Sequence, residues 1–233
     1  MLSTLNFMDL GLLILRWLHL FFGVIWIGLL YYFNFVQGPF FNETDAATKS
    51  NATQKLVPRA LWWFRWAAFW TFATGFTYLM ASGHQNAGAG LASAYWVNIL
   101  TGSLLGTLMF LNVWGIIWRN QKVVIANAVQ TASGGAANPN AAAAGARALV
   151  ASRTNTMFSI PMLFFMLSAR HLPYGVTETS NLTLYWILIF VLIGALEINA
   201  IKGKLGPLTT IKGVITCGFV LTATLGAIIA LTI

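Results

Sequence analysis

Six runs of apolar residues, each long enough to cross a lipid bilayer as a helix, divide this chain. A helix rises about 1.5 Å per residue, so about 20 apolar residues cross the roughly 30 Å hydrocarbon core of a membrane. We therefore predict an all-α fold, a polytopic membrane helical bundle that forms a single transmembrane domain over residues 1–233. The predicted transmembrane helices are 15–36, 61–82, 95–118, 147–168, 182–201 and 208–233.

The composition agrees with a protein that lies within lipid. Hydrophobic residues make up 58% of the chain and charged residues only 8%, whereas about a quarter of an ordinary soluble domain is charged. The one cysteine, Cys217, falls within the last predicted helix, which excludes a disulfide framework. Residues 1–17 lack a basic region and a small-residue cleavage site, so we expect them to belong to the mature first helix rather than to a signal peptide.

Lysine and arginine are distributed unevenly between the two ends of the predicted helices. Cytoplasmic loops of membrane proteins carry an excess of these residues. The pattern therefore predicts a multi-pass protein of the bacterial inner membrane with both termini in the periplasm, and we expect no nucleic acid partner despite the net charge of +8. The basic residues assigned to the cytoplasmic side are Lys49, Lys55, Arg59, Arg65, Arg119, Lys122, Arg147, Arg153, Lys202, Lys204 and Lys212.

Residues 126–146 form a low-complexity segment, rich in alanine and glycine, in the third predicted loop. The pairs Gly134-Gly135 and Asn138-Pro139 are typical of turns, and alanine is the strongest helix former. We predict a cytoplasmic spacer in which the alanines after Pro139 extend the fourth helix beyond the membrane.

Two histidines lie at the periplasmic ends of predicted helices, His19 in RWLHLFFG and His171 in LSARHLPY. Each has an arginine close by in the sequence, Arg16 and Arg170, and these two arginines are the basic residues outside the cytoplasmic group. An ionisable residue inside a membrane is costly and is a candidate functional residue by default. The third histidine, His84, falls in a Gly- and Ala-rich loop, where we expect it to be solvated.

The two histidines and two arginines predict a cofactor or metal site near the periplasmic face. Two imidazoles at one depth could bind the iron of one haem b axially, with Arg16 and Arg170 placed for its propionates. Copper or zinc is an alternative, because imidazole binds both metals. Gly23, one turn after His19, would leave room either for a macrocycle or for another helix. In the latter interpretation His19 is hydrogen-bonded to a neighbouring helix and no cofactor is bound.

Other polar residues fall within the predicted helices. Arg65 and Glu197 lie near the cytoplasmic ends of their helices, so we expect an ion pair between them, or an ion pair with Lys202. Asn112 and Asn155 could hydrogen-bond between the third and fourth helices, an interaction that holds membrane helices together.

Four sequence blocks, in order, resemble the membrane-bound bacterial urate hydroxylase (urate oxidase) family: RWLHLFFGVIWIGLLYYF, WWFRWAAFWTFATGF, NVWGIIWRNQK and SRTNTMFSIPMLFFMLSARHLPY. The resemblance implies a membrane domain that works in urate oxidation. Thr154 stands where the family tends to have histidine, and the chain lacks the Cys-x-x-Cys-His motif of the family's usual C-terminal cytochrome c domain. The residues that match are His19, Trp26, Gly28, Trp66, Gly75, Asn112, Asn120, Gln121, Arg153, Asn155, Pro161 and His171.

Two functional hypotheses follow for this bilayer-embedded chain. In the first it is a redox or electron-transfer subunit that binds haem b and passes electrons to a separate cytochrome c-like partner. In the second it is a non-catalytic structural or interaction subunit, which packs in a larger membrane complex or forms a homo-oligomer. Arg153 and Asn155 lie about 25 Å from His171 along one helix, so they cannot all contact one purine. We therefore expect these two to serve helix packing, and we expect the isolated chain not to turn over urate.

Overall fold

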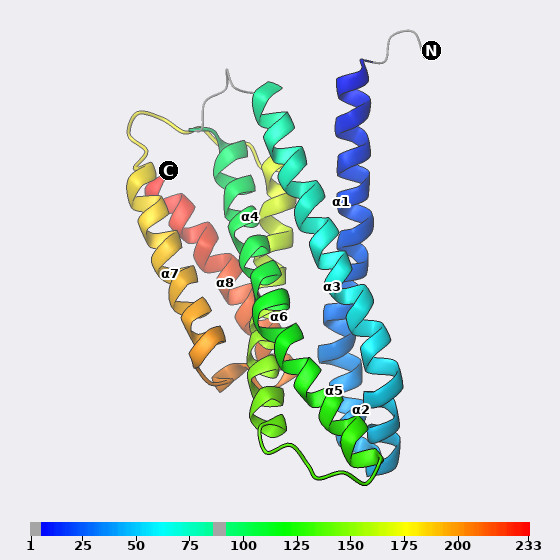
Figure 1. The fold of residues 1–233 in the computed structure, drawn as a ribbon. Coiled ribbons are helices and arrows are strands. Elements are labelled where there is room, and N and C mark those ends of the chain that lie inside the picture. The colour runs from blue at the N-terminus through cyan, green and yellow to red at the C-terminus, as the bar shows by residue number, and fades with distance from the viewer. Residues whose placement is uncertain (1–5, 86–91) are drawn as a thin grey trace.

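The computed structural model describes residues 6–85 and 92–233, and the regular structure in these residues is entirely helical, which confirms the all-α prediction. Six helical rods run side by side (Figure 1). Two of these rods contain a short π-helix that continues from one α-helix into the next. The helices are α1 Phe7–Tyr31, the π-helix η2 Tyr32–Gln37, α2 Gly38–Glu43, α3 Ala46–Gln85, α4 Ala94–Asn112, the π-helix η4 Val113–Ile117, α5 Trp118–Ala132, α6 Ala141–His171, α7 Leu182–Lys202, the 3-10 helix η5 Gly206–Thr209 and α8 Ile211–Thr232.

A short connection capped by Asp45 joins α2 to α3. The Asp45 carboxylate accepts hydrogen bonds from the backbone N–H groups of Ala47 and Thr48, both at 2.9 Å. The Thr48 hydroxyl donates to the same carboxylate, and together these donors hold the pKa of the Asp45 carboxyl below its ordinary value. Polar residues cap four other helices in the same way: Asn6, Ser93, Asn181 and Thr210.

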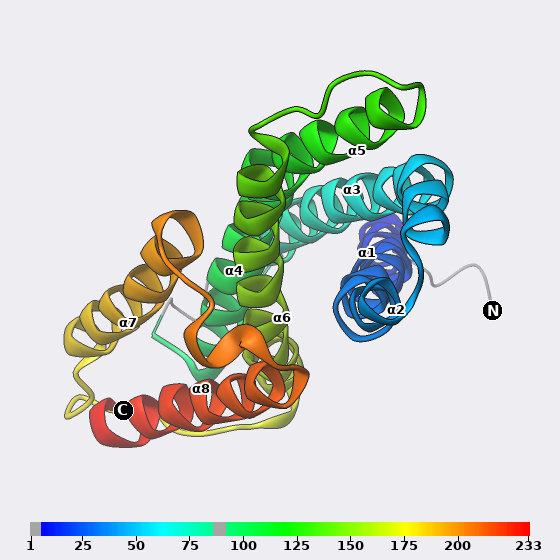
Figure 2. The same cartoon turned by 90° about the horizontal axis from the view of Figure 1, so that it is seen from below.

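Helix α6 lies at the centre of the bundle, where α1, α4, α5, α7 and α8 all pack on it (Figure 2). A helix that other helices screen from lipid does not need an apolar surface. Accordingly, α6 buries a polar stretch that consists of Thr154, Asn155, Thr156 and Ser159. Its packing on α4 is close at Gly102, where an added Cβ would lie 3.2 Å from atoms of Met166.

Four of the rods are long and apolar enough to cross a membrane: Phe7–Glu43, Ala94–Ala132, Leu182–Lys202 and Ile211–Thr232. Large apolar side chains cover much of their outer surface, for example Val24 on α1, Val191 on α7 and Phe219 on α8, all of them exposed. Soluble monomers rarely expose apolar patches of this extent. By helix length and hydropathy, therefore, the chain is a multi-pass membrane protein.

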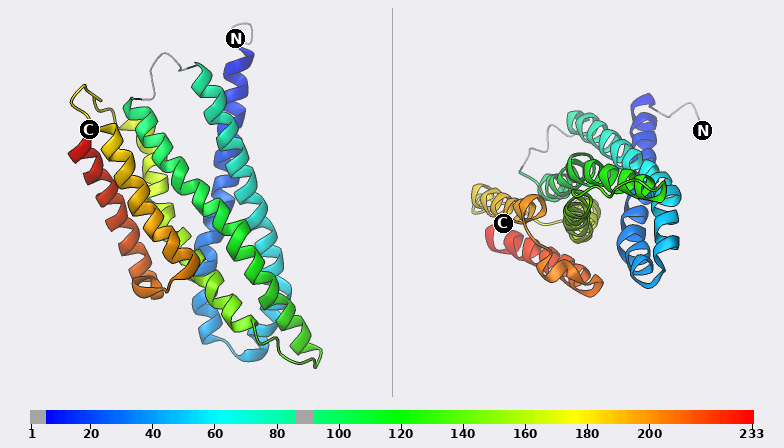
Figure 3. Two further views of the ribbon diagram at one scale, coloured as in Figure 1. Left: turned by 60° about the vertical axis from the view of Figure 1, so that its left-hand side comes forward. Right: turned by 60° about the horizontal axis from the view of Figure 1, so that its bottom comes forward.

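The rods differ in length, and α6, with 31 residues, is intermediate between three long rods and two short ones. The first, second and third contain 37, 40 and 39 residues, whereas α7 and α8 contain 21 and 22. At one end of the bundle α2, α3 and α5 extend past the turn between α7 and α8 (Figure 3). At the other end, the start of α1 and the end of α8 lie on the same side (Figure 1). The first helix begins at Phe7 instead of residue 15, and the side-chain oxygen of Asn6 caps it by accepting a hydrogen bond from the backbone N–H of Met8.

The structure leaves only residues 133–140 of the Ala- and Gly-rich segment outside helices. The alanine run after Pro139 forms the first turns of α6, in agreement with the prediction. Gly134 has a φ of +79°, a conformation that glycine adopts without strain. The side-chain oxygen of Asn127 accepts a 2.7 Å hydrogen bond from the backbone N–H of Asn138, so α5 holds the end of this turn.

Candidate functional site

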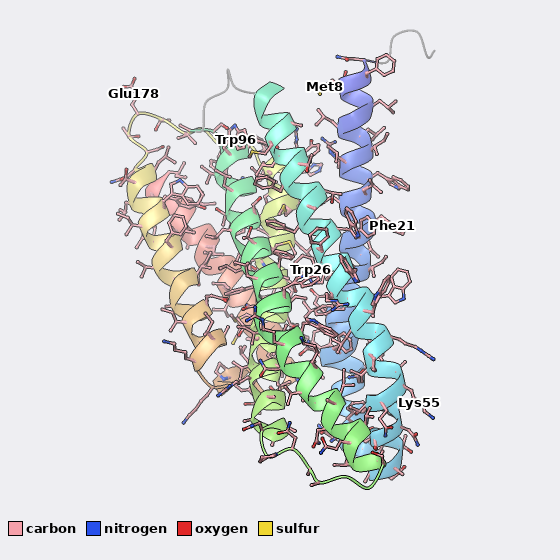
Figure 4. All side chains as sticks on the ribbon, in the orientation of Figure 1. Met8, Phe21, Trp26, Lys55, Trp96 and Glu178 are labelled. Atoms are coloured by element: carbon pink, nitrogen blue, oxygen red, sulfur yellow. The ribbon has the colours of Figure 1, made fainter. Side chains whose placement is uncertain are left out.

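One face of α1 carries the residues that the sequence singled out, and it packs against α3. Arg16, His19, Gly23 and Trp26 recur every three or four residues, so they lie on one side of the helix. Trp26 is only 2% exposed, whereas Phe21 lies on the outer surface and is half-exposed (Figure 4). The exposure of His19 is intermediate between that of Trp26 and that of Phe21.

A hydrogen bond and a missing side chain hold His19 against α3. Its Nδ1 lies 2.8 Å from the backbone oxygen of Thr71, and because a carbonyl can only accept, Nδ1 carries the hydrogen. A Cβ at Gly75 would lie 2.6 Å from both Nδ1 and Cε1, so the imidazole occupies space that any other residue would fill. The Nε2 atom keeps its lone pair, as in metal-binding histidines whose other nitrogen donates to a carbonyl.

Both predicted arginines are stacked on tyrosines of neighbouring helices. The guanidinium of Arg16 lies 4.9 Å from the ring centre of Tyr78 on α3, and its Nη2 donates a hydrogen bond to the Tyr78 hydroxyl. The guanidinium of Arg170 lies 4.8 Å from the ring centre of Tyr95 on α4. These cation–π contacts orient the two arginines but leave both side chains exposed.

His171 occupies the last turn of α6, where its side chain is exposed. Helices α1 and α6 meet at Tyr31 and Ser159, whose hydroxyls are 2.9 Å apart. His19 and His171 are each 12 residues from this contact, on the same side of it, or about 18 Å along each helix. The two histidines therefore lie at matching height, but in the described part of the chain no hydrogen bond or ring contact joins them.

A buried polar network connects α4, α6 and α7. The Asn112 amide nitrogen lies 3.0 Å from the Asn155 side-chain oxygen and 3.1 Å from a Glu197 carboxylate oxygen. The Asn155 amide nitrogen donates to the backbone oxygen of Met109 at 2.9 Å. The prediction that Asn112 and Asn155 bond between helices is confirmed.

The predicted ion pair between Arg65 and Glu197 is wrong. Glu197 accepts its hydrogen bond from Asn112, and the Arg65 guanidinium lies 4.0 Å from the ring centre of Trp118. Glu197 is near the end of α7, as predicted, but Arg65 lies in the middle of α3, because that helix begins at Ala46 and not at residue 61. The Glu197 carboxylate is therefore paired with an amide and the Arg65 guanidinium with an aromatic ring, and among the described residues neither is paired with an opposite charge.

Arg153 differs from its near neighbour Asn155, although both match the family motif. The Arg153 side chain is only 9% exposed, and its Nε and Nη1 are buried without a hydrogen-bond partner. A buried charge is costly unless an acceptor compensates it. The expectation of a packing role therefore agrees with the contacts of Asn155, whereas Arg153 is a candidate contact for an anion.

A second buried polar group, which sequence reasoning missed, lies near the start of α4 and α7. The hydroxyls of Thr101 and Tyr185 are 2.6 Å apart. Asn98, one turn before Thr101, is fully buried and neither its amide nitrogen nor its oxygen has a partner. The hydroxyl of Tyr174, in the connection after α6, is also buried and unpartnered; burial, together with Tyr185, raises its pKa. The available signal was an asparagine within the apolar run YWVNIL.

The family model for "Urate oxidase N-terminal" matches residues 90–223, more than half of the chain. The matched range includes Asn112, Arg153, Asn155 and His171, whereas His19 lies before it. Comparisons with curated proteins and with solved structures found no match. The family match extends beyond the four sequence blocks into α7 and most of α8. The chain therefore belongs to the urate oxidase N-terminal family.

Proposed function

We propose that this chain is a membrane-embedded redox subunit in which His19 is a ligand of haem b. The observation that carries the proposal is the hydrogen bond between His19 Nδ1 and the Thr71 carbonyl oxygen, 2.8 Å long. This bond selects the tautomer with a free lone pair on Nε2 and orients the ring on Gly75. Metal-binding histidines are held in the same way by a second group behind the ligand.

Three residues at the same end of the bundle as His19, namely His171, Arg16 and Arg170, have side chains that suit such a group. His171, at matching height, is exposed and would be available as a second ligand. Arg16 and Arg170 lie at the same end of the bundle, and each can bind a propionate because its side chain is exposed. A haem bound there would carry single electrons, and the protein would supply the ligands and the surrounding charge.

The proposed topology has six membrane crossings and both termini in the periplasm. The start of α1 and the end of α8 lie on one side of the bundle, which agrees with an even number of crossings (Figure 1). Lysines and arginines gather at the opposite end, which supports a cytoplasmic location for that end. Helices α3 and α6 would cross the membrane as well, since they run alongside the four apolar rods. A cytochrome c-like partner would then meet the histidine end.

The family name suggests urate as the substrate of the assembly in which this chain works. Arg153 supports an anion contact in the inner half of the bundle, because its buried guanidinium lacks an acceptor. This residue lies 18 residues before His171 on α6, about 27 Å away. One urate anion cannot span that distance, so binding and electron transfer would need separate sites. We therefore propose that the isolated chain does not turn over urate.

A visible spectrum of the purified protein tests the haem proposal. We expect a Soret band that shifts on reduction with dithionite. His19→Ala should abolish or shift the band, whereas His84→Ala, which changes the third histidine of the sequence, should leave it unchanged. The side chain of His84 lies outside the described residues and is not part of the proposed site. A featureless spectrum from protein produced with ample haem would contradict the proposal.

Urate-dependent oxygen consumption tests the second part. The purified chain should consume no oxygen with urate, because we expect electrons from urate to leave through a separate acceptor protein that the purified chain does not include. Turnover that His19→Ala abolishes would show that the chain is a complete enzyme and would disprove this part of the proposal.

The alternative is a structural or interaction subunit. It is favoured by the hydrogen bond from His19 to α3, which the interpretation without a cofactor also predicts, and by the pairing of the arginines. Arg16 is already engaged with Tyr78, and Arg170 with Tyr95, so neither needs a propionate to be oriented. In this case the exposed apolar faces of α1, α7 and α8 would bind lipid, further copies of the chain or another membrane subunit. A featureless spectrum combined with stable oligomers in detergent would support this function.

A further inference from the structure

Three tryptophans surround the guanidinium of Arg65, which belongs to α3. Its central carbon lies 4.0 Å from the ring centre of Trp118, 5.3 Å from that of Trp114 and 5.6 Å from that of Trp66. The rings come from α5, η4 and α3, so three segments of the chain build the group. We name these four residues the Arg65 cage. Cation–π contacts of this kind hold an arginine in place without neutralising its charge.

A second cation, Lys122, lies beside the Arg65 cage. Its Nζ is 5.7 Å from the ring centre of Trp118, which precedes it by about one helical turn. In the part of the chain that the structure describes, neither Arg65 nor Lys122 has a carboxylate partner. Two positive charges therefore share one aromatic ring without a counter-charge, and the local potential favours an anion.

Two hydrogen-bond donors of the cage also lack acceptors. The Nε of Arg65 and the Nε1 of Trp114 are buried, and neither has a partner. An unpaired buried donor destabilises a protein. The Arg65 side chain as a whole is only half-buried, so a ligand can reach it from outside the bundle. A group with several acceptor oxygens, such as phosphate, matches the planar guanidinium best.

The position of the cage points to lipid as the source of that phosphate. Trp62 and Trp63, in the turn before Arg65, are 49% and 55% exposed, and their ring centres are 5.0 Å apart. Exposed tryptophans are typical of the boundary between membrane and water. Lys55 lies nearer the same end of the bundle, where basic residues gather (Figure 4). The Arg65 cage is therefore at the level of lipid headgroups.

We propose that the Arg65 cage binds the phosphate of an anionic phospholipid headgroup. Arg65 donates to the phosphate oxygens, Lys122 adds a second positive charge, and the tryptophan rings keep the guanidinium in place. Anionic lipids are attracted to basic residues on the cytoplasmic side of membrane proteins, and the cage would make this attraction specific to one position. The proposal is independent of any cofactor at His19.

Native mass spectrometry of the protein in detergent tests this site, with phosphatidylglycerol and phosphatidylcholine added in equal amounts. The wild-type protein should retain phosphatidylglycerol preferentially. Arg65→Gln should weaken that binding about tenfold, because it removes a charge-assisted bond to phosphate. Arg59→Gln, which removes the same charge from an exposed position on α3, should have little effect. Trp114→Phe keeps an aromatic ring but removes a donor, so it should weaken binding less than Arg65→Gln.

Two results would overturn the proposal. Equal losses in Arg65→Gln and Arg59→Gln would mean that lipid is attracted by net charge and not by the cage. Displacement of phosphatidylglycerol by an equal concentration of inorganic phosphate would assign the site to a soluble anion. Should circular dichroism show that Arg65→Gln does not fold, Lys122→Gln with Arg119→Gln as its control would replace it, with the same expected contrast.

Discussion

Replacing Gly75 with alanine should separate the contact of His19 from the general packing of α1 on α3. The new Cβ would lie 2.6 Å from two atoms of the imidazole, which is 0.8 Å closer than the 3.4 Å at which ordinary contact begins. The ring must then move away from α3. Its 2.8 Å hydrogen bond to Thr71 would lengthen towards the limit of a hydrogen bond.

The expected change in the free energy of unfolding follows from two destabilising effects and one stabilising effect. Overpacking costs about 1–3 kcal/mol, and loss of the hydrogen bond costs about 1 kcal/mol. Alanine stabilises a helix interior by about 1 kcal/mol relative to glycine. Gly75→Ala should therefore lower the free energy of unfolding by about 1–3 kcal/mol in total. Gly28→Ala is the matched control, because a Cβ at Gly28 would have no neighbour within 4 Å and only the gain in helix stability should remain.

Unfolding by SDS in mixed micelles, followed by circular dichroism, measures both free energies. The decisive comparison repeats Gly75→Ala in a His19→Ala background, where the clash cannot occur and the substitution should be neutral or stabilising. The reasoning is refuted if Gly75→Ala costs as much without the imidazole as with it. In that case the glycine serves helix packing alone, and His19 is not positioned by it.

Three further predictions use the same unfolding assay. Asn155→Leu should destabilise the protein by about 1–2 kcal/mol, because it leaves Asn112 with Glu197 as its only partner; an unchanged midpoint would show that the network does not hold α4 and α6 together. Asn98→Leu should stabilise the protein by about 1–3 kcal/mol, because it removes a buried amide without partners; destabilisation would reveal a water or ligand bound to that amide. Asp45, whose pKa is lowered on folding, should contribute fully to the free energy of unfolding above about pH 4, and this contribution should disappear as the pH falls through the pKa of the folded state. Asp45→Asn, which keeps the cap, should reduce the dependence of the free energy of unfolding on pH. An identical pH dependence in the variant would contradict the assignment.

The number of helices was predictable from the sequence, because each apolar run is long and is separated from the next by polar or turn-forming residues. The helix ends were less predictable. A hydropathy argument places the second helix at residues 61–82, yet α3 begins at Ala46 and runs through Pro58. A proline in a helix removes one hydrogen bond but does not end a helix that tertiary contacts support.

The candidate site was predictable in its residues but not in its contacts. An intramembrane histidine stands out in a chain of apolar residues, so His19 could be found by its chemistry. Its partners could not be found in this way. Every residue has a backbone carbonyl like that of Thr71, so the sequence does not mark the acceptor, and Gly75 contributes by lacking a side chain. The same limit applies to Glu197. Charge suggested a bond to Arg65, whereas the arrangement of α4 and α7 places it beside Asn112.

The unequal rods have a consequence for where this protein meets the aqueous phase. A span of about 30 Å is filled by α7 or α8, whereas the three long rods reach about 55–60 Å. The long rods therefore extend beyond the length that α7 and α8 span, at the start of α1 as well as at the opposite end of the bundle (Figure 1). At the end where α7 is followed by α8, the ends of α2, α3 and α5 form a helical extension past that turn (Figure 3). This extension carries basic residues such as Lys49 and Lys55 on α3, so positive charge is held on helices, and not on a loop, beyond the α7–α8 turn (Figure 4).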